Sequence, residues 1–101
     1  MRESQVISLT VDSSKVAALC KKYGVSSLAL FGSFVRHEAD ADSDVDLLVS
    51  FSGRVSLLRM VALERELSQL FGREVDLQTE AALSPYIRDY IMNERQTIYA
   101  A

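Results

Sequence analysis

The sequence contains one cysteine, one histidine, one proline, four glycines and no tryptophan. Cys20 alone cannot form an internal disulfide, and a single cysteine excludes a zinc site built from several cysteines. We expect Cys20 to lie in the core, in a reducing compartment. No apolar run approaches the roughly 18 residues that cross a bilayer, and residues 1–10 lack the pattern of a signal peptide. These absences predict a cytoplasmic protein.

The sequence also has fewer basic than acidic residues. The chain has 11 Lys and Arg against 14 Asp and Glu, which gives a formal net charge of -3. Proteins that hold nucleic acids through their phosphates normally carry the opposite sign. We therefore expect no direct binding to nucleic acid.

The length predicts one domain that covers residues 1–101. Of these residues 49% are hydrophobic and 25% are charged, which is typical of a folded domain. A domain of this size buries roughly 60–65% of its unfolded surface, enough for one core but not for a second lobe. Any separate module for binding a substrate must then come from another molecule.

Hydrophobic spacing predicts an α/β fold, because helical and strand patterns alternate along the chain. Asp12 or Ser13 can cap the first helix, and Ser84 followed by Pro85 is typical of the start of the last one. The predicted helices span residues 13–23, 56–71 and 85–93. The predicted strands span residues 26–31, 44–51, 74–79 and 97–100.

Two of these helices carry apolar side chains that we expect to be buried. In the second helix one stripe contains Leu57, Met60, Leu63, Leu67, Leu70 and Phe71. In the last helix, adjoining faces contain Tyr86, Ile87, Tyr90 and Ile91. We interpret these four residues as core, with a surface for a partner protein as the alternative.

The first chemical signal is Gly32-Ser33, directly after the strand at residues 26–31. Glycine lets an anion approach the backbone closely, and the N–H groups at the start of a helical turn can bind it. The hydroxyl group of Ser33 adds a donor. The dipeptide by itself is equally consistent with an ordinary turn followed by a helix cap.

The second signal is a pair of acidic residues in one strand. Asp44 and Asp46 are two residues apart, so both carboxylates point to one face while Val45 and Leu47 point to the other. Such a pair suits a hard divalent cation such as Mg²⁺, which prefers carboxylate and phosphate oxygens. A solvated acidic surface is the alternative.

A third acidic residue, Asp76, lies in the middle of the strand at residues 74–79. It could complete a triad with Asp44 and Asp46 if the two strands are neighbours in the sheet. Three carboxylates can hold two metal ions, which would activate an attacking oxygen and bind a triphosphate. The alternative is a solvent-facing Asp on a half-exposed sheet.

Together, Gly32-Ser33, Asp44-x-Asp46 and Asp76 resemble the nucleotidyltransferase superfamily that includes DNA polymerase beta. The order of helices and strands resembles that family over most of the chain. Five further residues match the longer pattern Gly-Ser-x-x-Arg-x-x-Ala-x-x-x-Ser-Asp-x-Asp-Leu-x-Val of minimal nucleotidyltransferase (MNT) domains: Arg36, Ala39, Ser43, Leu47 and Val49.

The resemblance implies a small mixed β-sheet packed by helices and assigns roles within it. Gly32 and Ser33 would hold a nucleotide triphosphate such as ATP, and Arg36 would lie near its phosphates. Two Mg²⁺ ions would be bound by the three acidic residues Asp44, Asp46 and Asp76, which would also be the catalytic residues. His37 stands where many members have glycine, and we expect it to be exposed rather than catalytic.

The small size, together with the resemblance, indicates a protein acceptor. Minimal domains of this type resemble antitoxins that transfer AMP to a tyrosine of a HEPN-family ribonuclease toxin, in a hetero-oligomeric complex. An antitoxin that only masks the active site of its partner is the main alternative. Transfer to a small molecule is a third possibility.

Overall fold

The computed structural model describes residues 11–101; residues 1–10, where we expect no signal peptide, lie outside the described part. The elements follow in the order α1 (Ser13–Tyr23), β1 (Val25–Phe31), η2 (Gly32–Phe34), β2 (Val45–Phe51), α2 (Leu57–Phe71), β3 (Val75–Gln78), η3 (Glu80–Ala82), α3 (Pro85–Glu94) and β4 (Gln96–Ala100). Each predicted helix and strand is present within one residue of its expected bounds. The short 3₁₀ helix η2 is the helical turn expected at Gly32-Ser33, whereas η3 was not predicted. No helix in residues 11–101 is long and apolar enough to span a bilayer.

The helices begin and end where the sequence predicts because their terminal groups are capped. The side chains of Asp12, Ser56 and Ser84 each accept a hydrogen bond from a backbone N–H of the first turn. Gly24 and Gly72 end α1 and α2 in the left-handed conformation, which glycine adopts without steric cost.

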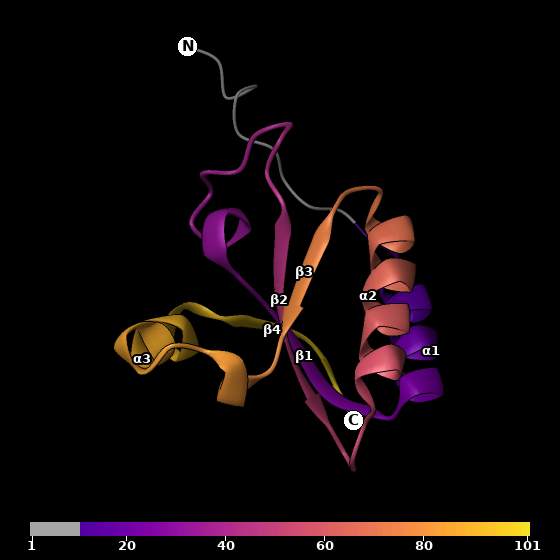
Figure 1. Cartoon of the computed structure of the whole chain (residues 1–101). Helices are drawn as coiled ribbons and strands as arrows, with labels where there is room; N and C mark the ends of the chain where they lie inside the picture. Colours follow the sequence, from indigo (N-terminus) through magenta and orange to yellow (C-terminus); the bar gives the residue numbers. More distant parts are fainter. Residues whose placement is uncertain (1–10) are drawn as a thin grey trace.

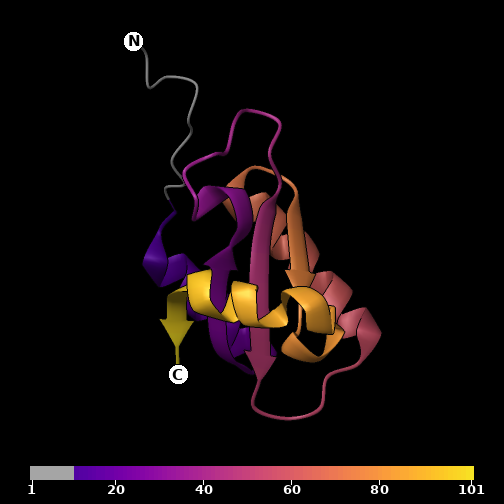
Figure 2. The same ribbon diagram turned by 90° about the vertical axis from the view of Figure 1, so that its left-hand side faces the viewer.

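The strands form one mixed sheet in the order β3-β2-β1-β4. β1 is antiparallel to both β2 and β4, whereas β2 and β3 are parallel. Helices α1 and α2 lie side by side on one face of the sheet, and α3 lies on the other (Figure 1). Turned by 90°, the view shows α3 crossing the strands (Figure 2). The α/β fold with a small mixed sheet is therefore confirmed.

Each face of the sheet contributes to a separate hydrophobic core because neighbouring side chains of a strand point in opposite directions. Leu28 and Leu30 of β1 pack toward α1 and α2, together with Cys20, which is fully buried as expected. Ala29 and Phe31 belong to the smaller core beneath α3. Side chains on that second face are the ones that can reach a site between the sheet and α3.

The predicted stripe of α2 is buried in its middle but not at its start. Leu63 and Leu67 are fully buried, whereas Leu57 is 77% exposed. The prediction was therefore wrong for Leu57. The periodicity predicted the helix face on which Leu57 lies, but the first turn of α2 extends beyond the stretch that packs against the sheet.

This difference along α2 predicts a large difference between two leucine variants. We expect Leu63→Ala to lower the free energy of unfolding by about 2–5 kcal/mol, because it leaves a cavity in the main core. Leu58, 83% exposed on the same helix, is the matched control, and Leu58→Ala should change the free energy by less than about 0.5 kcal/mol. Urea denaturation followed by circular dichroism measures both values. Equal losses for the two variants would contradict this packing.

Helix α3 also differs from the prediction. Of the four residues interpreted as core, only Ile91 is buried; Tyr86 is 95% exposed, and Ile87 and Tyr90 are exposed as well. The helix lies on the sheet by itself, and no second layer among residues 11–101 covers its outer side (Figure 2). The interpretation as core was therefore wrong for these three residues, and the partner surface remains the open alternative.

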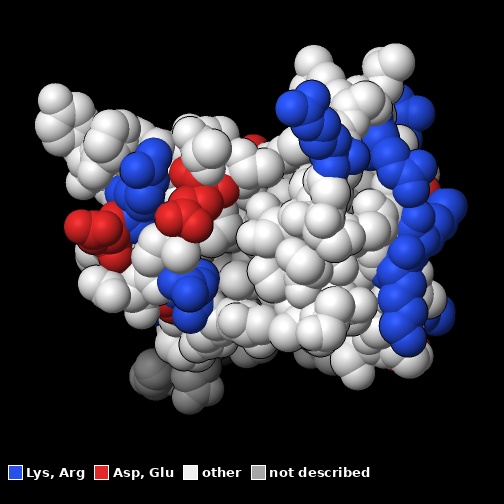
Figure 3. Space-filling model, turned by 90° about the horizontal axis from the view of Figure 1, so that it is seen from below, with Lys and Arg blue, Asp and Glu red and all other residues white. Residues whose placement is uncertain are grey.

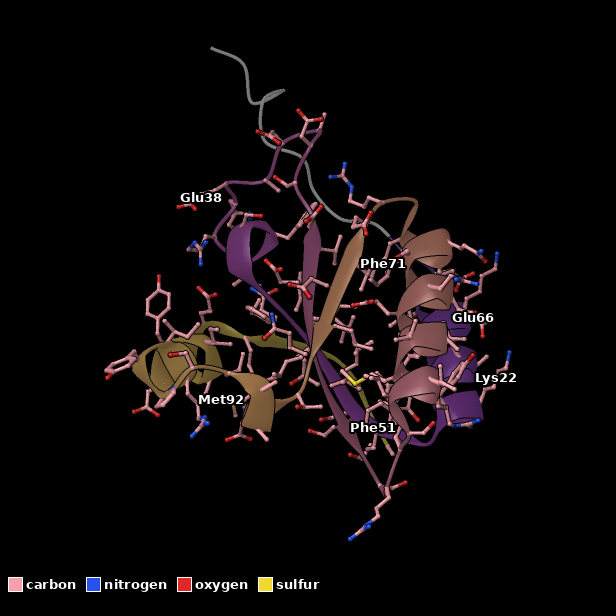
Figure 4. The ribbon with its side chains drawn as sticks, in the orientation of Figure 1. Lys22, Glu38, Phe51, Glu66, Phe71 and Met92 are labelled. Carbon is pink, nitrogen blue, oxygen red and sulfur yellow. The ribbon has the colours of Figure 1, made fainter. Side chains whose placement is uncertain are left out.

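Helices α1 and α2 are joined at their outer edge by polar contacts. The Lys22 ammonium lies 3.2 Å from a carboxylate oxygen of Glu66, which also accepts a hydrogen bond from the hydroxyl of Tyr23. Figure 4 shows Lys22 and Glu66 on the side of the helices away from the sheet. Seen from below, Lys and Arg side chains line this side of the molecule, while charges of both signs mix at the side of α3 (Figure 3).

Candidate active site

The candidate site starts at a tight turn that follows β1. Gly32 is buried and has a φ of +79°, a left-handed conformation that side chains oppose. A Cβ atom at this position would lie 2.2 Å from the Oδ2 atom of Asp46. The backbone of η2 can therefore approach the carboxylate of Asp46 only because residue 32 is glycine.

The acidic residues come together through the parallel pairing of β2 and β3. Asp46 and Asp76 are register partners in this pair. Val45 and Val75 beside them point into the core under α1 and α2, so both carboxylates lie on the face that α3 crosses. Asp44 is exposed and lies one residue before β2, rather than within the strand as predicted. The strands of Asp46 and Asp76 are thus neighbours, as the triad requires.

The electrostatics of the site disfavour three ionised carboxylates without a counterion. The pKa of Asp46 is raised above its ordinary value of 3.8, first by partial burial and then by the negative charges of Asp76 and Asp44. The positive charge of Arg36 acts in the opposite direction. A bound cation would remove this repulsion.

The donor set fits a hard divalent cation in its chemistry and its place in the sheet, since carboxylate oxygens are the ligands that Mg²⁺ prefers. Within residues 11–101, no group of three His, Cys, Asp or Glu side chains is arranged closely enough to hold a metal as it stands. Asp76 instead accepts a hydrogen bond from the side-chain amide of Gln78 at 3.2 Å. Side-chain rotation of exposed carboxylates would be needed to complete the site.

Two donors for an anion lie beside the acidic residues. The backbone N–H of Gly32 and the guanidinium of Arg36 both face the carboxylate of Glu94, which accepts from them at 2.9 and 3.2 Å. Ser33 is partly exposed in the same turn. Sequence reasoning selected Gly32, Ser33 and Arg36, but it missed Glu94. This residue is 62 positions from Gly32, and no local motif marks it.

His37 follows this turn with an exposed side chain, as expected. Its φ of 60° makes it the only non-glycine residue with a positive φ among the described residues. A glycine at this position, as in many members of the family that the motif resembles, would adopt the same backbone without strain. The positive φ at residue 37 is therefore a physical reason for glycine at this position.

An open pocket of about 260 Å³ joins the turn to α3. One part of its lining is polar and contains Gly32, Arg36, Asp46 and Glu94. The other part is apolar and comes from Phe31, Ile87, Tyr90 and Ile91. A larger groove of about 430 Å³ lies between α1 and α2, on the opposite face of the sheet from the carboxylates.

The fold, with two acidic residues in register on one face of the sheet beside a glycine turn, is that of enzymes that transfer nucleotides. The chain belongs to the nucleotidyltransferase domain family, whose model matches residues 14–98. It is 42% identical to the protein adenylyltransferase MntA of Thermococcus cleftensis, over 75% of this chain and 77% of that protein.

Solved structures show the same fold. One that is provisionally identified as a minimal nucleotidyltransferase has 37% identity and a TM-score of 0.72, with 83% of this chain and 86% of that chain covered. Another contains a tri-AMPylated HEPN toxin of Shewanella oneidensis in complex with an MNT antitoxin. Its matching chain has 16% identity and a TM-score of 0.64, with 88% and 70% covered. At that identity the second likeness concerns the fold alone.

Proposed function

We propose that this nucleotidyltransferase moves AMP from ATP to the hydroxyl group of a tyrosine in a HEPN-family ribonuclease toxin, and so acts as its antitoxin in the cytoplasm. The observation that carries the proposal is the register of Asp46 with Asp76 beside the turn at Gly32. The name of the Thermococcus relative supports AMP transfer to a protein. The AMPylated toxin of Shewanella supports a HEPN acceptor.

Different residues of the chain would bind the phosphates and take the proton of the acceptor. The N–H of Gly32, the hydroxyl of Ser33 and the guanidinium of Arg36 would hold the β- and γ-phosphates, which leave as pyrophosphate. The acceptor oxygen forms a bond to the α-phosphorus while the bond between the α-phosphorus and the bridging oxygen breaks. Asp76, the more exposed register partner of Asp46, would face the acceptor and take the proton of its hydroxyl group.

The three carboxylates Asp44, Asp46 and Asp76 would hold two Mg²⁺ ions. Bound there, the ions would supply positive charge that neutralises the phosphates and lowers the pKa of the acceptor hydroxyl. The ions would also offset the negative charges of Asp76 and Asp44, which together with the larger effect of partial burial raise the pKa of Asp46. Their effect on the acceptor hydroxyl explains why the chain needs no nucleophile of its own.

A second candidate is an antitoxin that neutralises its partner by masking alone. The observation that favours it is the apolar outer side of α3, where Tyr86, Ile87 and Tyr90 are exposed next to the site. Exposed aromatic residues on one helix are common where proteins associate. The two candidates differ in whether neutralisation requires the acidic residues.

The deciding experiment follows the α-phosphate of ATP. The purified protein is incubated with host lysate, Mg²⁺ and ATP labelled at the α-phosphate, and the products are separated by gel electrophoresis and analysed by mass spectrometry. We expect label on a tyrosine of one protein band. The Asp44→Asn/Asp46→Asn variant should give no label, whereas Asp42→Asn, an exposed Asp of the same loop, should label normally.

The possible outcomes separate the two candidates. Label that persists in the double Asn variant would rule out the proposed mechanism. If no label depends on the acidic residues, but the double variant still neutralises a partner recovered by pull-down, masking is the function. Label on a small molecule without any protein acceptor would contradict both.

A further inference from the structure

Glu94 at the end of α3 occupies the position of an anion in the candidate site. One of its carboxylate oxygens accepts a hydrogen bond from the N–H of Gly32 at 2.9 Å. Both oxygens lie 3.2 Å from the same guanidinium nitrogen of Arg36. The side chain is only 12% exposed. Two donors that face one nearly buried carboxylate are the contacts that a phosphate oxygen would make.

Arg36 has a second glutamate partner, Glu38, whose surroundings differ from those of Glu94. Glu38 binds Arg36 through the Nε atom at 3.1 Å, but it has no contact with Gly32 and its side chain is 62% exposed. Figure 4 shows Glu38 in the loop beyond η2, away from the strands. The two glutamates therefore share a partner, and only Glu94 lies inside the pocket.

The charges around Glu94 work against a second anion in the same place. Asp46 lines the same pocket as Glu94, and Glu94 itself contributes to the negative field at Asp46. A nucleotide triphosphate cannot use the N–H of Gly32 and the inner side of Arg36 while the Glu94 carboxylate holds them. Binding must therefore break the contacts of Glu94.

We propose that Glu94 is a further residue of the nucleotide site, one that holds the phosphate position in the free protein and is displaced when a nucleoside triphosphate binds. This inference rests on the proposed function, which assigns Gly32 and Arg36 to the phosphates. Glu94 lowers the apparent affinity for the nucleotide because only the fraction of molecules with Glu94 displaced can bind it. It also keeps the turn and Arg36 in place until then.

The test is the affinity of the full chain for ATP with Mg²⁺, measured by isothermal titration calorimetry at constant ionic strength. We expect Glu94→Gln to lower the dissociation constant about tenfold, because the uncharged amide competes poorly for Arg36. Glu94→Ala should give a similar gain, and melting curves establish that both variants are folded. Glu38→Gln removes the same charge from the other side of Arg36 and should change the constant less than about twofold.

Three other results would overturn the inference, and they bear differently on the proposed function. If the protein binds ATP and Glu94→Gln binds it equally or more weakly, Glu94 does not compete and the proposed function stands. If Glu38→Gln gains as much as Glu94→Gln, the effect is one of net charge alone. If neither the protein nor any variant binds ATP, the nucleotide site itself is wrong, and both proposals fail.

Discussion

Gly32→Ala is expected to reduce AMP transfer by at least about a hundredfold, because a shift of about 1 Å in a reacting group can have an effect of this size. The added Cβ would lie 2.2 Å from the Oδ2 atom of Asp46, so that the carboxylate or the turn must move. The N–H of residue 32 remains present in the variant. A loss of AMP transfer would therefore result from the displaced carboxylate or turn and not from a missing hydrogen bond.

Gly72→Ala is the matched control for this prediction. Gly72 has a similar positive φ of +72°, but a Cβ atom there meets nothing within 4 Å. Both variants should lose roughly 1 kcal/mol of stability from the left-handed backbone, whereas only Gly32→Ala should lose activity. Initial rates of label transfer and urea denaturation measure the two effects. Equal activities in the two variants would show that the contact between Gly32 and Asp46 has no catalytic importance.

Asp46→Asn is expected to separate activity from stability. Replacing even a residue that supports a metal ligand typically reduces activity by 10–100-fold, so loss of a ligand should reduce transfer by at least about a hundredfold. In the absence of metal the same change should stabilise the fold, since it removes a partly buried charge that Asp76 and Asp44 also repel. We expect a gain of roughly 1 kcal/mol at neutral pH, equivalent to a rise of about 4–8 °C in Tm.

The stability that Asp46→Asn gains in the absence of metal should depend on pH, because the pKa of Asp46 is raised in the folded protein. The unfolded chain loses this proton near the ordinary pKa of 3.8, and the folded protein loses it only at higher pH. As pH rises from 3.8 through the raised pKa, the protein therefore loses stability relative to Asp46→Asn. Below pH 3.8 Asp46 is protonated in both states, and the advantage of the variant should disappear. Melting curves in metal-free buffer between pH 3 and 8 measure this trend.

Magnesium should reverse the order of stabilities. Mg²⁺ binds the folded protein through the carboxylates and should raise its Tm, while Asp46→Asn should respond little. Asp42→Asn removes an exposed charge of the same loop, and it should respond to Mg²⁺ as the unchanged protein does. If Asp46→Asn is less stable than the unchanged protein at neutral pH without metal, the proposed repulsion between Asp46 and the other two carboxylates is wrong. The same response to Mg²⁺ in Asp46→Asn and in the protein would contradict the metal site.

Much of the fold could be predicted because its signals are local. A capping side chain such as Asp12 or Ser56, a left-handed glycine such as Gly72 and the period of the apolar residues each act over a few positions. They located the helices and strands within one residue. Burial could not be predicted in the same way, since Leu57 has the right spacing but no neighbouring element that covers it.

By itself, the sequence determined the alternation of helices and strands and the residue types that suit phosphate and metal at Gly32, Ser33, Asp44, Asp46 and Asp76. Only the tertiary structure decided that Asp46 and Asp76 are partners, because strand order and register depend on how the whole sheet packs. It alone brought Glu94 to Gly32, and left Tyr86 and Tyr90 exposed. Contacts between distant residues follow from how the layers cover one another, and no local pattern encodes them.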